Sequence, residues 1–180
     1  GIKVKSNYNN SKNNTNNRKI EQMSKIQNGY LKVEAKFIKL LMENKVLRNN
    51  VLMDVEIEDF LFGDTKEIFN YIIKNKELDK ITIDKIKSLN ISEEYVKTIQ
   101  NIPIDEINTY TLEGTKKIID QIKKNIIDDE IKSMSDEIKQ LSNKKLELLK
   151  ENNTSTKEVD DKIMDLSLEV LKREKIKKDL

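Results

Sequence analysis

Between residues 115 and 150 the chain has neither glycine nor proline, so a single long helix is the structure that this stretch forms most readily. Its apolar side chains recur at alternating steps of four and three residues, at Ile127, Ile131, Met134, Ile138 and Leu141. This spacing is the seam of a helix that packs along a partner helix. A helix of about 35 residues is about 50 Å long, which exceeds the width of a small domain.

The partner helix is predicted at the end of the chain. Asn152, Asn153 and Thr154 interrupt the first pattern, and Ser155 with Glu158 three residues later forms a capping box. Behind this box, apolar residues again step by four and three, at Val159, Ile163, Leu166 and Val170. Two amphipathic helices joined by a short polar turn form an antiparallel hairpin.

The second helix of this hairpin carries another apolar stripe, made of Met164, Leu168 and Leu171. A two-helix hairpin has one internal face, so this stripe lacks an intramolecular partner. Because burial of a Leu or Met side chain stabilises by about 1.5–3 kcal/mol, the stripe predicts a docking surface. In the alternative interpretation, an apolar stripe wider than about 100° wraps around the hairpin seam.

Several shorter helices are predicted before the long one. Leu31, Ala35, Ile38 and Met42 have the spacing of one helical face. Further helices are expected to begin at three sites with capping residues: Asp64 followed by Glu67, Thr82, and Ser92. No segment shows a convincing strand alternation. We therefore predict an all-α fold, with a small helical bundle at 30–127 followed by a long helix and an antiparallel helical hairpin at 128–180.

The first 29 residues are predicted to form a disordered or flexible polar linker. They are rich in Asn, and such a stretch cannot bury enough apolar area to offset its backbone entropy. The linker is basic, whereas the rest of the chain has a slight acidic excess. Weak, non-specific contacts with nucleic-acid phosphates could therefore come from Lys3, Lys5, Lys12, Arg18, Lys19 and Lys25.

Composition excludes several kinds of chemistry. The chain has no Cys and no His, which excludes soft-ligand zinc and iron–sulfur sites, thiol chemistry and a histidine acid or base. Four Gly leave no room for a glycine-rich phosphate loop. Runs of carboxylates such as Asp128-Asp129-Glu130 and Asp160-Asp161 diverge by about 100° per residue on a helix. We expect no catalytic residue, metal, cofactor or small-molecule ligand, and no enzyme activity.

Membrane insertion is not expected either. The longest apolar run is three residues, as at Val51-Leu52-Met53, whereas a membrane helix needs about 20. The first residues lack the apolar core of a signal peptide, and a chain without cysteine suits a reducing compartment. These features favour a cytoplasmic protein.

Three motifs in the first half of the bundle follow one another in an order known from a protein family. Glu34 to Leu41 has the form E-x-x-apolar-apolar-x-apolar-apolar, Glu58 to Phe60 is an acidic–aromatic turn, and Glu67 to Ile72 begins a second apolar helix. This order resembles the C-terminal helicase-binding domain of bacterial DnaG-type primases. The linking helix of that family resembles Lys116 to Gln140. The resemblance covers about residues 30–180.

The resemblance implies a non-catalytic interaction domain that recruits primase to the replication fork. In the family, the hairpin binds the N-terminal collar of the replicative DnaB-type helicase, and the bundle helps to stimulate the helicase. The parent protein would be a DNA-directed RNA polymerase, but this chain itself is not expected to synthesise RNA. Helicase contacts are expected on the outward stripe and its charged rim, at Met164, Leu168, Glu169, Leu171, Arg173, Ile176 and Lys177.

Two other identities remain open from the sequence. The N-terminal collar domain of the helicase has a similar bundle, hairpin and opening motif, and it would assemble into dimers or rings. An unrelated coiled-coil scaffold would carry the same seam. The basic end of the chain has a local explanation as well, because cations at a helix C-terminus stabilise the helix dipole by about 0.3–1 kcal/mol.

Overall fold

The computed structural model describes the backbone of residues 10–150 and 156–180, and the side chains within those ranges from residue 25 onward. The regular elements are α1 (Asn10–Glu43), α2 (Lys45–Val51), a 3-10 helix η1 (Ile57–Asp59), α3 (Gly63–Lys74), α4 (Ile83–Lys87), α5 (Glu93–Gln100), α6 (Ile104–Asn108), α7 (Leu112–Lys150) and α8 (Lys157–Asp179). No strand occurs in these ranges, which confirms the predicted all-α class.

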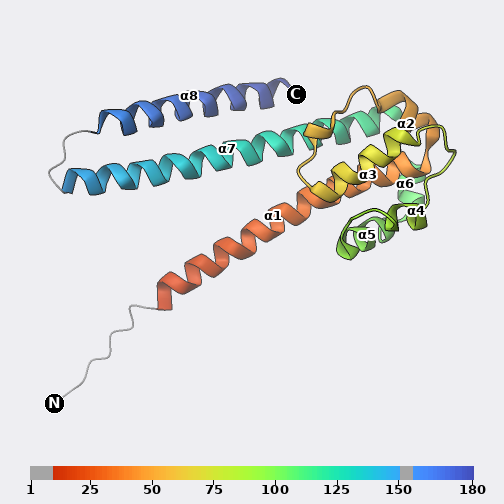
Figure 1. Cartoon of the computed structure of the whole chain (residues 1–180), viewed down its shortest axis with the longest axis horizontal. Helices are drawn as coiled ribbons and strands as arrows, with labels where there is room; N and C mark the ends of the chain where they lie inside the picture. The colour runs from red at the N-terminus through yellow and green to blue at the C-terminus, as the bar shows by residue number, and fades with distance from the viewer. Residues whose placement is uncertain (1–9, 151–155) are drawn as a thin grey trace, which may run out of the picture.

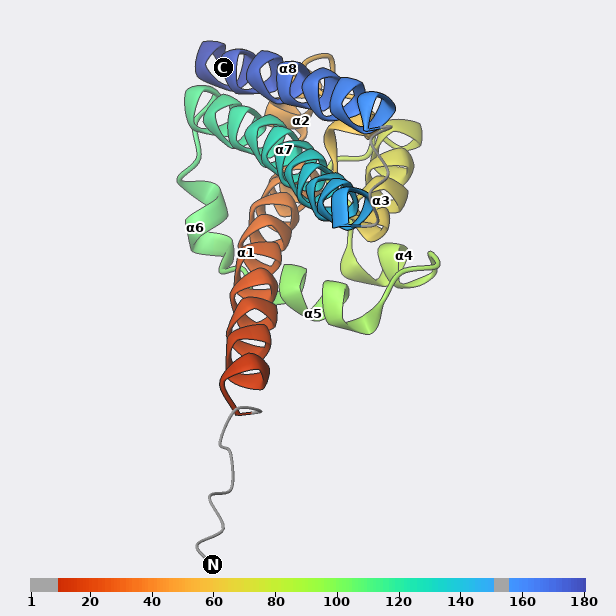
Figure 2. The same ribbon diagram turned by 90° about the vertical axis from the view of Figure 1, so that its left-hand side faces the viewer.

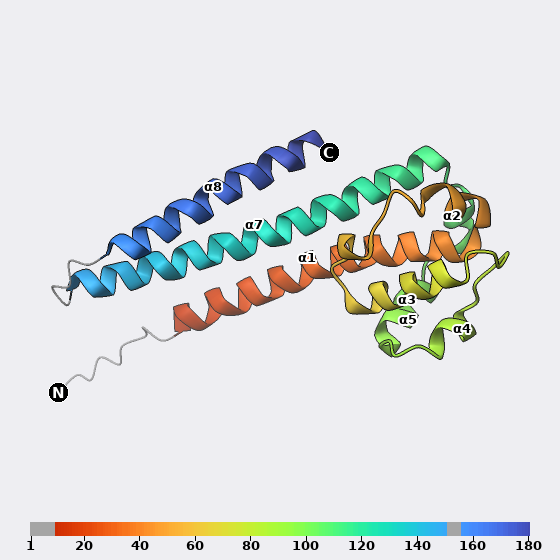
Figure 3. The same cartoon turned by 45° about the horizontal axis from the view of Figure 1, so that its top comes forward.

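Three long helices dominate the architecture (Figure 1). The short elements α2 to α6 surround the C-terminal half of α1, and Figure 2 shows α3 and α6 on opposite sides of it. Helix α8 runs alongside the C-terminal part of α7 in the opposite direction (Figures 1 and 3). In all three views α7 lies between α1 and α8, so one side of α8 faces away from the rest of the molecule.

The hydrophobic core is built around α1. Ala35, Ile38 and Met42, which the spacing predicts on one inward face, are completely buried, but so are Phe37 and Leu40 on other sides. This part of α1 is therefore enclosed nearly all round, as expected for a helix at the centre of a bundle. An aromatic cluster joins it to its neighbours, because Phe60 lies 6.0 Å from Phe37 and 4.9 Å from Phe69 between ring centroids.

Two charged side chains lie inside the bundle. Arg48 of α2 is fully buried and donates to the backbone carbonyls of Leu41 at 2.7 Å, Lys76 at 2.9 Å and Leu78, so it fixes the segment after α3 against α1. Glu34 of α1 accepts from the amide of Leu61 at 2.7 Å, just before α3 begins. These backbone hydrogen bonds replace the water that each charge loses on burial.

The predicted N-cap residues of the short helices agree with the structure only in part. Ser92 is the N-cap of α5 and accepts from the amide of Tyr95 at 3.3 Å, as predicted. The prediction of Asp64 as an N-cap is wrong, because α3 begins at Gly63 with Phe62 in the cap position. The carboxylate of Asp64 instead accepts from the hydroxyl of Ser92 at 2.5 Å, so it connects α3 to α5. Thr82 occupies the cap position of α4 without a side-chain hydrogen bond.

The predicted linker at 1–29 does not agree with the start of α1. The helix begins at Asn10, so residues 10–29 are helical, whereas residues 1–9 lie outside the described part. Once the buried part of α1 has formed, each residue added at its N-terminal end gains a hydrogen bond without a new nucleation cost. A polar sequence can therefore be helical without burying apolar area.

Helix α7 is continuous from Leu112 to Lys150 and passes without interruption through residues 127 and 128, where the bundle and the hairpin were divided. The bundle and the hairpin thus share one helix. The predicted break at Asn152 to Thr154 and the capping residue Ser155 lie outside the described residues, and α8 begins at Lys157 with Thr156 in the cap position.

Candidate docking face of the helical hairpin

The seam between α7 and α8 is only partly closed. The predicted seam residues of α8, which include Ile163 and Leu166, are half-buried, and none of the residues of α8 is fully buried. The facing residues of α7, from Ile131 to Leu141, are half-buried as well. Each of two paired helices shields only one side of the other from water. The side chains in the seam therefore already occupy the single internal face of the hairpin.

Ion pairs across the seam set the register of the two helices. Lys145 contacts Asp160 at 2.5 Å and Lys162 contacts Glu137 at 2.7 Å. Nearer the bundle, Arg173 contacts Glu130 at 3.2 Å, and Lys177 contacts Asp128. Each exposed pair contributes at most about 1 kcal/mol, but four of them at successive levels favour one alignment over a shifted one.

The second apolar stripe of α8 lies on the opposite side from α7. Met164, Leu168 and Leu171 are 58%, 51% and 62% exposed. A stripe that wrapped the seam would bury these side chains against α7, so their exposure does not fit that alternative interpretation. We call these three residues the outward stripe.

The residues predicted at the rim of the outward stripe divide into two groups. Ile176 is exposed, and Glu169 is half-buried beside Lys172, which it contacts at 3.3 Å. Arg173 and Lys177 are not at the rim, because their side chains contact carboxylates of α7 across the seam. They occupy seam positions, three and seven residues after Val170, and this spacing in the sequence could have identified them.

Several exposed charges next to the outward stripe were not among the predicted helicase contacts, although three of them belong to the basic end of the chain noted from the sequence. They are Asp161, Asp165, Lys172 and Lys175, which are all exposed, and Lys178, which is exposed as well but lines a depression together with Lys124, Asp128 and Ile131 of α7. Their steps of three, four and seven residues from Leu168 or Leu171 place them on the same face. The outward stripe therefore has charged residues at both of its ends.

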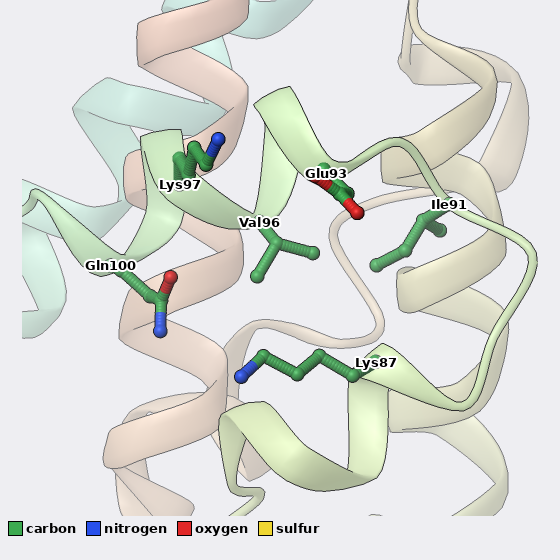
Figure 4. Close-up of a pocket in the computed structure, with 6 residues that line it drawn as sticks. All are labelled: Lys87, Ile91, Glu93, Val96, Lys97 and Gln100. Atoms are coloured by element: carbon green, nitrogen blue, oxygen red, sulfur yellow. The ribbon is translucent and has the colours of Figure 1, made fainter.

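A depression of about 440 Å³ lies between α4 and α5 and is lined by Lys87, Ile91, Glu93, Val96, Lys97 and Gln100. Figure 4 shows the amino group of Lys87 reaching past Val96, whereas the amino group of Lys97 points away from that of Lys87. The two cations do not converge on a shared ligand position. This depression therefore lacks the geometry of an anion-binding site.

Two of the three lysines that line the groove between α1 and α7, Lys36 and Lys117, are paired with carboxylates. Lys36 forms an ion pair with Glu106, and its ammonium lies 5.7 Å from the ring centroid of Tyr110. The hydrogen bond with Glu106 raises the pKa of Lys36. These contacts hold α6 and the segment after it against α1.

Among the residues described, no group of three or more His, Cys, Asp and Glu side chains is arranged to hold a metal ion. The described helices include none that is both long enough and apolar enough to cross a membrane. Comparisons with protein-family models, with curated proteins and with solved structures give no match. The candidate site is therefore interpreted from its own geometry and chemistry.

Proposed function

We propose that this chain is a non-catalytic interaction domain that docks another protein on the outward stripe of α8. The observation that carries this proposal is the exposure of Met164, Leu168 and Leu171 on a hairpin whose internal face is already occupied. Removing each of these side chains from water is worth about 1.5–3 kcal/mol, so a complementary apolar groove would bind the stripe. Charged neighbours at both ends would orient the partner.

The partner we propose is the N-terminal collar of a replicative DnaB-type helicase, with this chain as the helicase-recruiting part of a bacterial primase. The proposal is supported by the order of the three motifs, Glu34 to Leu41, Glu58 to Phe60 and Glu67 to Ile72, and by the bundle, shared long helix and hairpin. Docking would raise the local concentration of primase at the fork, since a tethered enzyme meets its template as an intramolecular partner.

The shared helix α7 connects the docking helix α8 to the bundle, so the bundle would move with the hairpin. Its N-terminal half packs on the core through Ile119 and Ile122, and its C-terminal half carries the hairpin seam. A continuous helix of 39 residues transmits a displacement of the hairpin to the bundle more directly than a loop would. The bundle would therefore be positioned against the helicase when α8 docks.

The test is a pull-down with the cognate replicative helicase, using Leu168→Asp combined with Leu171→Asp. We expect the double variant to lose binding, because two carboxylates would have to be buried in an apolar interface. The matched control is Met53→Asp, which changes a side chain that is 92% exposed on the bundle and should bind like the unmodified chain.

Circular dichroism should show equal helix content for both variants. If the double variant binds the helicase as well as Met53→Asp does, the outward stripe is not the docking face and the proposal is wrong.

A further inference from the structure

The exposed charges next to the outward stripe differ in sign along α8. Asp161 comes before the outward stripe, Asp165 lies within it beside Met164, and Lys172, Lys175 and Lys178 follow it, all of them exposed. Within the described part of the chain, four have no oppositely charged group within 4.0 Å: Asp161, Asp165, Lys175 and Lys178. Next to the outward stripe the charges therefore change from acidic to basic along α8, whereas Lys157 and Asp179 at the two ends of the helix are also exposed and have the opposite signs.

The helix dipole does not explain this separation. Its effect on charged side chains is confined to the first and last turns of a helix. Helix α8 runs from Lys157 to Asp179, so Asp165 and Lys172 both lie more than one turn from either end. The hairpin seam does not explain it either, because Asp161, Asp165, Lys172 and Lys175 are exposed and none of them forms an ion pair with the described part of α7.

The charges on this face of α8 are complementary to those of a second α8 that runs in the opposite direction. Asp161 lies seven residues before Leu168 and Lys175 lies seven residues after it. If a second α8 runs antiparallel with the two-fold axis at Leu168, each Asp161 faces Lys175 of the second copy. Parallel pairing would instead place Asp161 against Asp161, and like charges directly opposite are destabilising.

The same axis brings the apolar residues together. Met164 lies four residues before Leu168 and Leu171 lies three residues after it, so Met164 of one copy and Leu171 of the other differ in level by one residue, about 1.5 Å, which is close enough for contact. Leu168 meets its own counterpart near the axis. Six apolar side chains then form a continuous contact flanked by opposite charges at both ends, which is the self-complementary surface of an isologous dimer.

We propose that a second copy of this chain covers the outward stripe, through antiparallel pairing of the two α8 helices. The contact is narrow, since α8 has 23 residues and is about 34 Å long, so the dimer is weak and exchanges readily. The pairing stands on the charges and apolar residues of α8 alone. Its consequence, competition with the helicase for the same stripe, rests on the proposed function.

The first test uses charge reversal and sedimentation from about 10 µM to about 1 mM of the chain. We expect Asp161→Lys alone and Lys175→Glu alone each to weaken the dimer about tenfold, because both ion pairs become repulsive. An equimolar mixture of the two variants, and a chain carrying both changes, should restore dimerisation, because opposite charges face each other again.

The second test fixes the orientation of the two helices by cross-linking. The chain has no cysteine, so a single introduced one reports one position. Leu168→Cys should form a disulfide-linked dimer with itself. Asp161→Cys should not, because the two copies of this position are about 21 Å apart along the antiparallel helices, but it should link to Lys175→Cys in a mixture.

A chain that stays monomeric at about 1 mM, a self-linked Asp161→Cys dimer, or charge variants that dimerise as well as the unmodified chain would each overturn the pairing. Assembly beyond a dimer would also overturn it and would favour the collar-domain identity. If the dimer forms but does not inhibit helicase binding, the pairing stands and only the competition fails. Loss of helicase binding in the Leu168→Asp, Leu171→Asp variant reports on the proposed function separately.

Discussion

The bundle and the hairpin bury their side chains in different ways. In the bundle, α1 and α3 contribute completely buried residues such as Phe37 and Phe69, and the buried charges of Arg48 and Glu34 are bonded to backbone groups. In the hairpin, α8 has no fully buried residue, and several of its charges pair with α7 at the surface. The bundle therefore contributes most of the free energy of folding, whereas α8 keeps much of its surface accessible. Docking elements commonly come from the less stable parts of a fold.

The largest difference in the free energy of unfolding is expected between two truncations of apolar side chains, one in the bundle core and one in the hairpin seam. Phe69→Ala removes a fully buried ring that packs 4.9 Å from Phe60, and it should lower the free energy of unfolding by about 3–5 kcal/mol. Leu166→Ala, in the half-buried seam, should cost about half as much or less, since much of its surface is already in water. Urea unfolding followed by circular dichroism measures both. Equal losses would mean that the hairpin is as well packed as the bundle.

Two arginines allow a matched comparison of charged groups. Arg48→Ala leaves the carbonyls of Leu41, Lys76 and Leu78 without their donor inside the bundle and should cost about 3 kcal/mol. Arg173→Ala removes a partly exposed pair with Glu130 and should cost less than about 1 kcal/mol. Thermal unfolding of the two variants tests this ranking. A larger loss at Arg173 would show that the seam ion pairs, rather than the bundle, dominate stability.

The two regions should also respond to pH in opposite directions. Burial raises the pKa of Glu34 above its ordinary value of 4.5. The folded state then binds this proton more tightly than the unfolded state, so the stability linked to Glu34 is complete below pH 4.5 and falls as the pH rises through the raised pKa. Glu34→Gln should remove this fall, as measured by urea unfolding at several pH values. An unchanged pH profile in Glu34→Gln would contradict the assignment.

Asp160 in the hairpin has the reverse linkage. Its hydrogen bond with Lys145 lowers the pKa of its carboxyl below the ordinary value of 3.8. The stability that it contributes is present above pH 3.8 and is lost as the pH falls through the lowered value. Asp160→Asn should therefore weaken the acid dependence of the hairpin, which hydrogen exchange of α8 amides would report. Equal acid dependence in both proteins would show that this pair does not hold the hairpin.

The smallest effect on stability is expected at the outward stripe. Met164→Ser replaces a side chain that is more than half exposed, so it should change the free energy of unfolding by no more than about 0.5 kcal/mol. Thermal unfolding at a concentration low enough to keep the chain monomeric measures this. A loss above about 1 kcal/mol would show that Met164 packs within the hairpin after all.

Much of the helical pattern followed from the sequence, because it depends on neighbours one turn away. The steps of four and three from Ile127 to Leu141 predicted the long helix α7, and the spacing of Met164, Leu168 and Leu171 predicted a stripe separate from the seam. Side chains three or four residues apart share a helix face whatever the rest of the chain does.

Other features depended on residues far away in the sequence. Asp64 was predicted to cap its own helix, but it bonds to Ser92 instead, and Arg48 finds its acceptors at Lys76 and Leu78. Arg173 and Lys177 were placed at the rim of the outward stripe, whereas they pair with α7. A charged side chain takes the partner that the fold places opposite it, and periodicity within one helix does not contain that information.

The sequence by itself therefore determined the all-α class, the long helix and the apolar stripe of α8, because helix geometry relates these residues to near neighbours only. The tertiary structure decided where α1 begins, which charges are buried, and which face of α8 is left uncovered. Those outcomes depend on long-range contacts, such as that of Glu34 with Leu61, whose free energy is gained only when the whole bundle assembles.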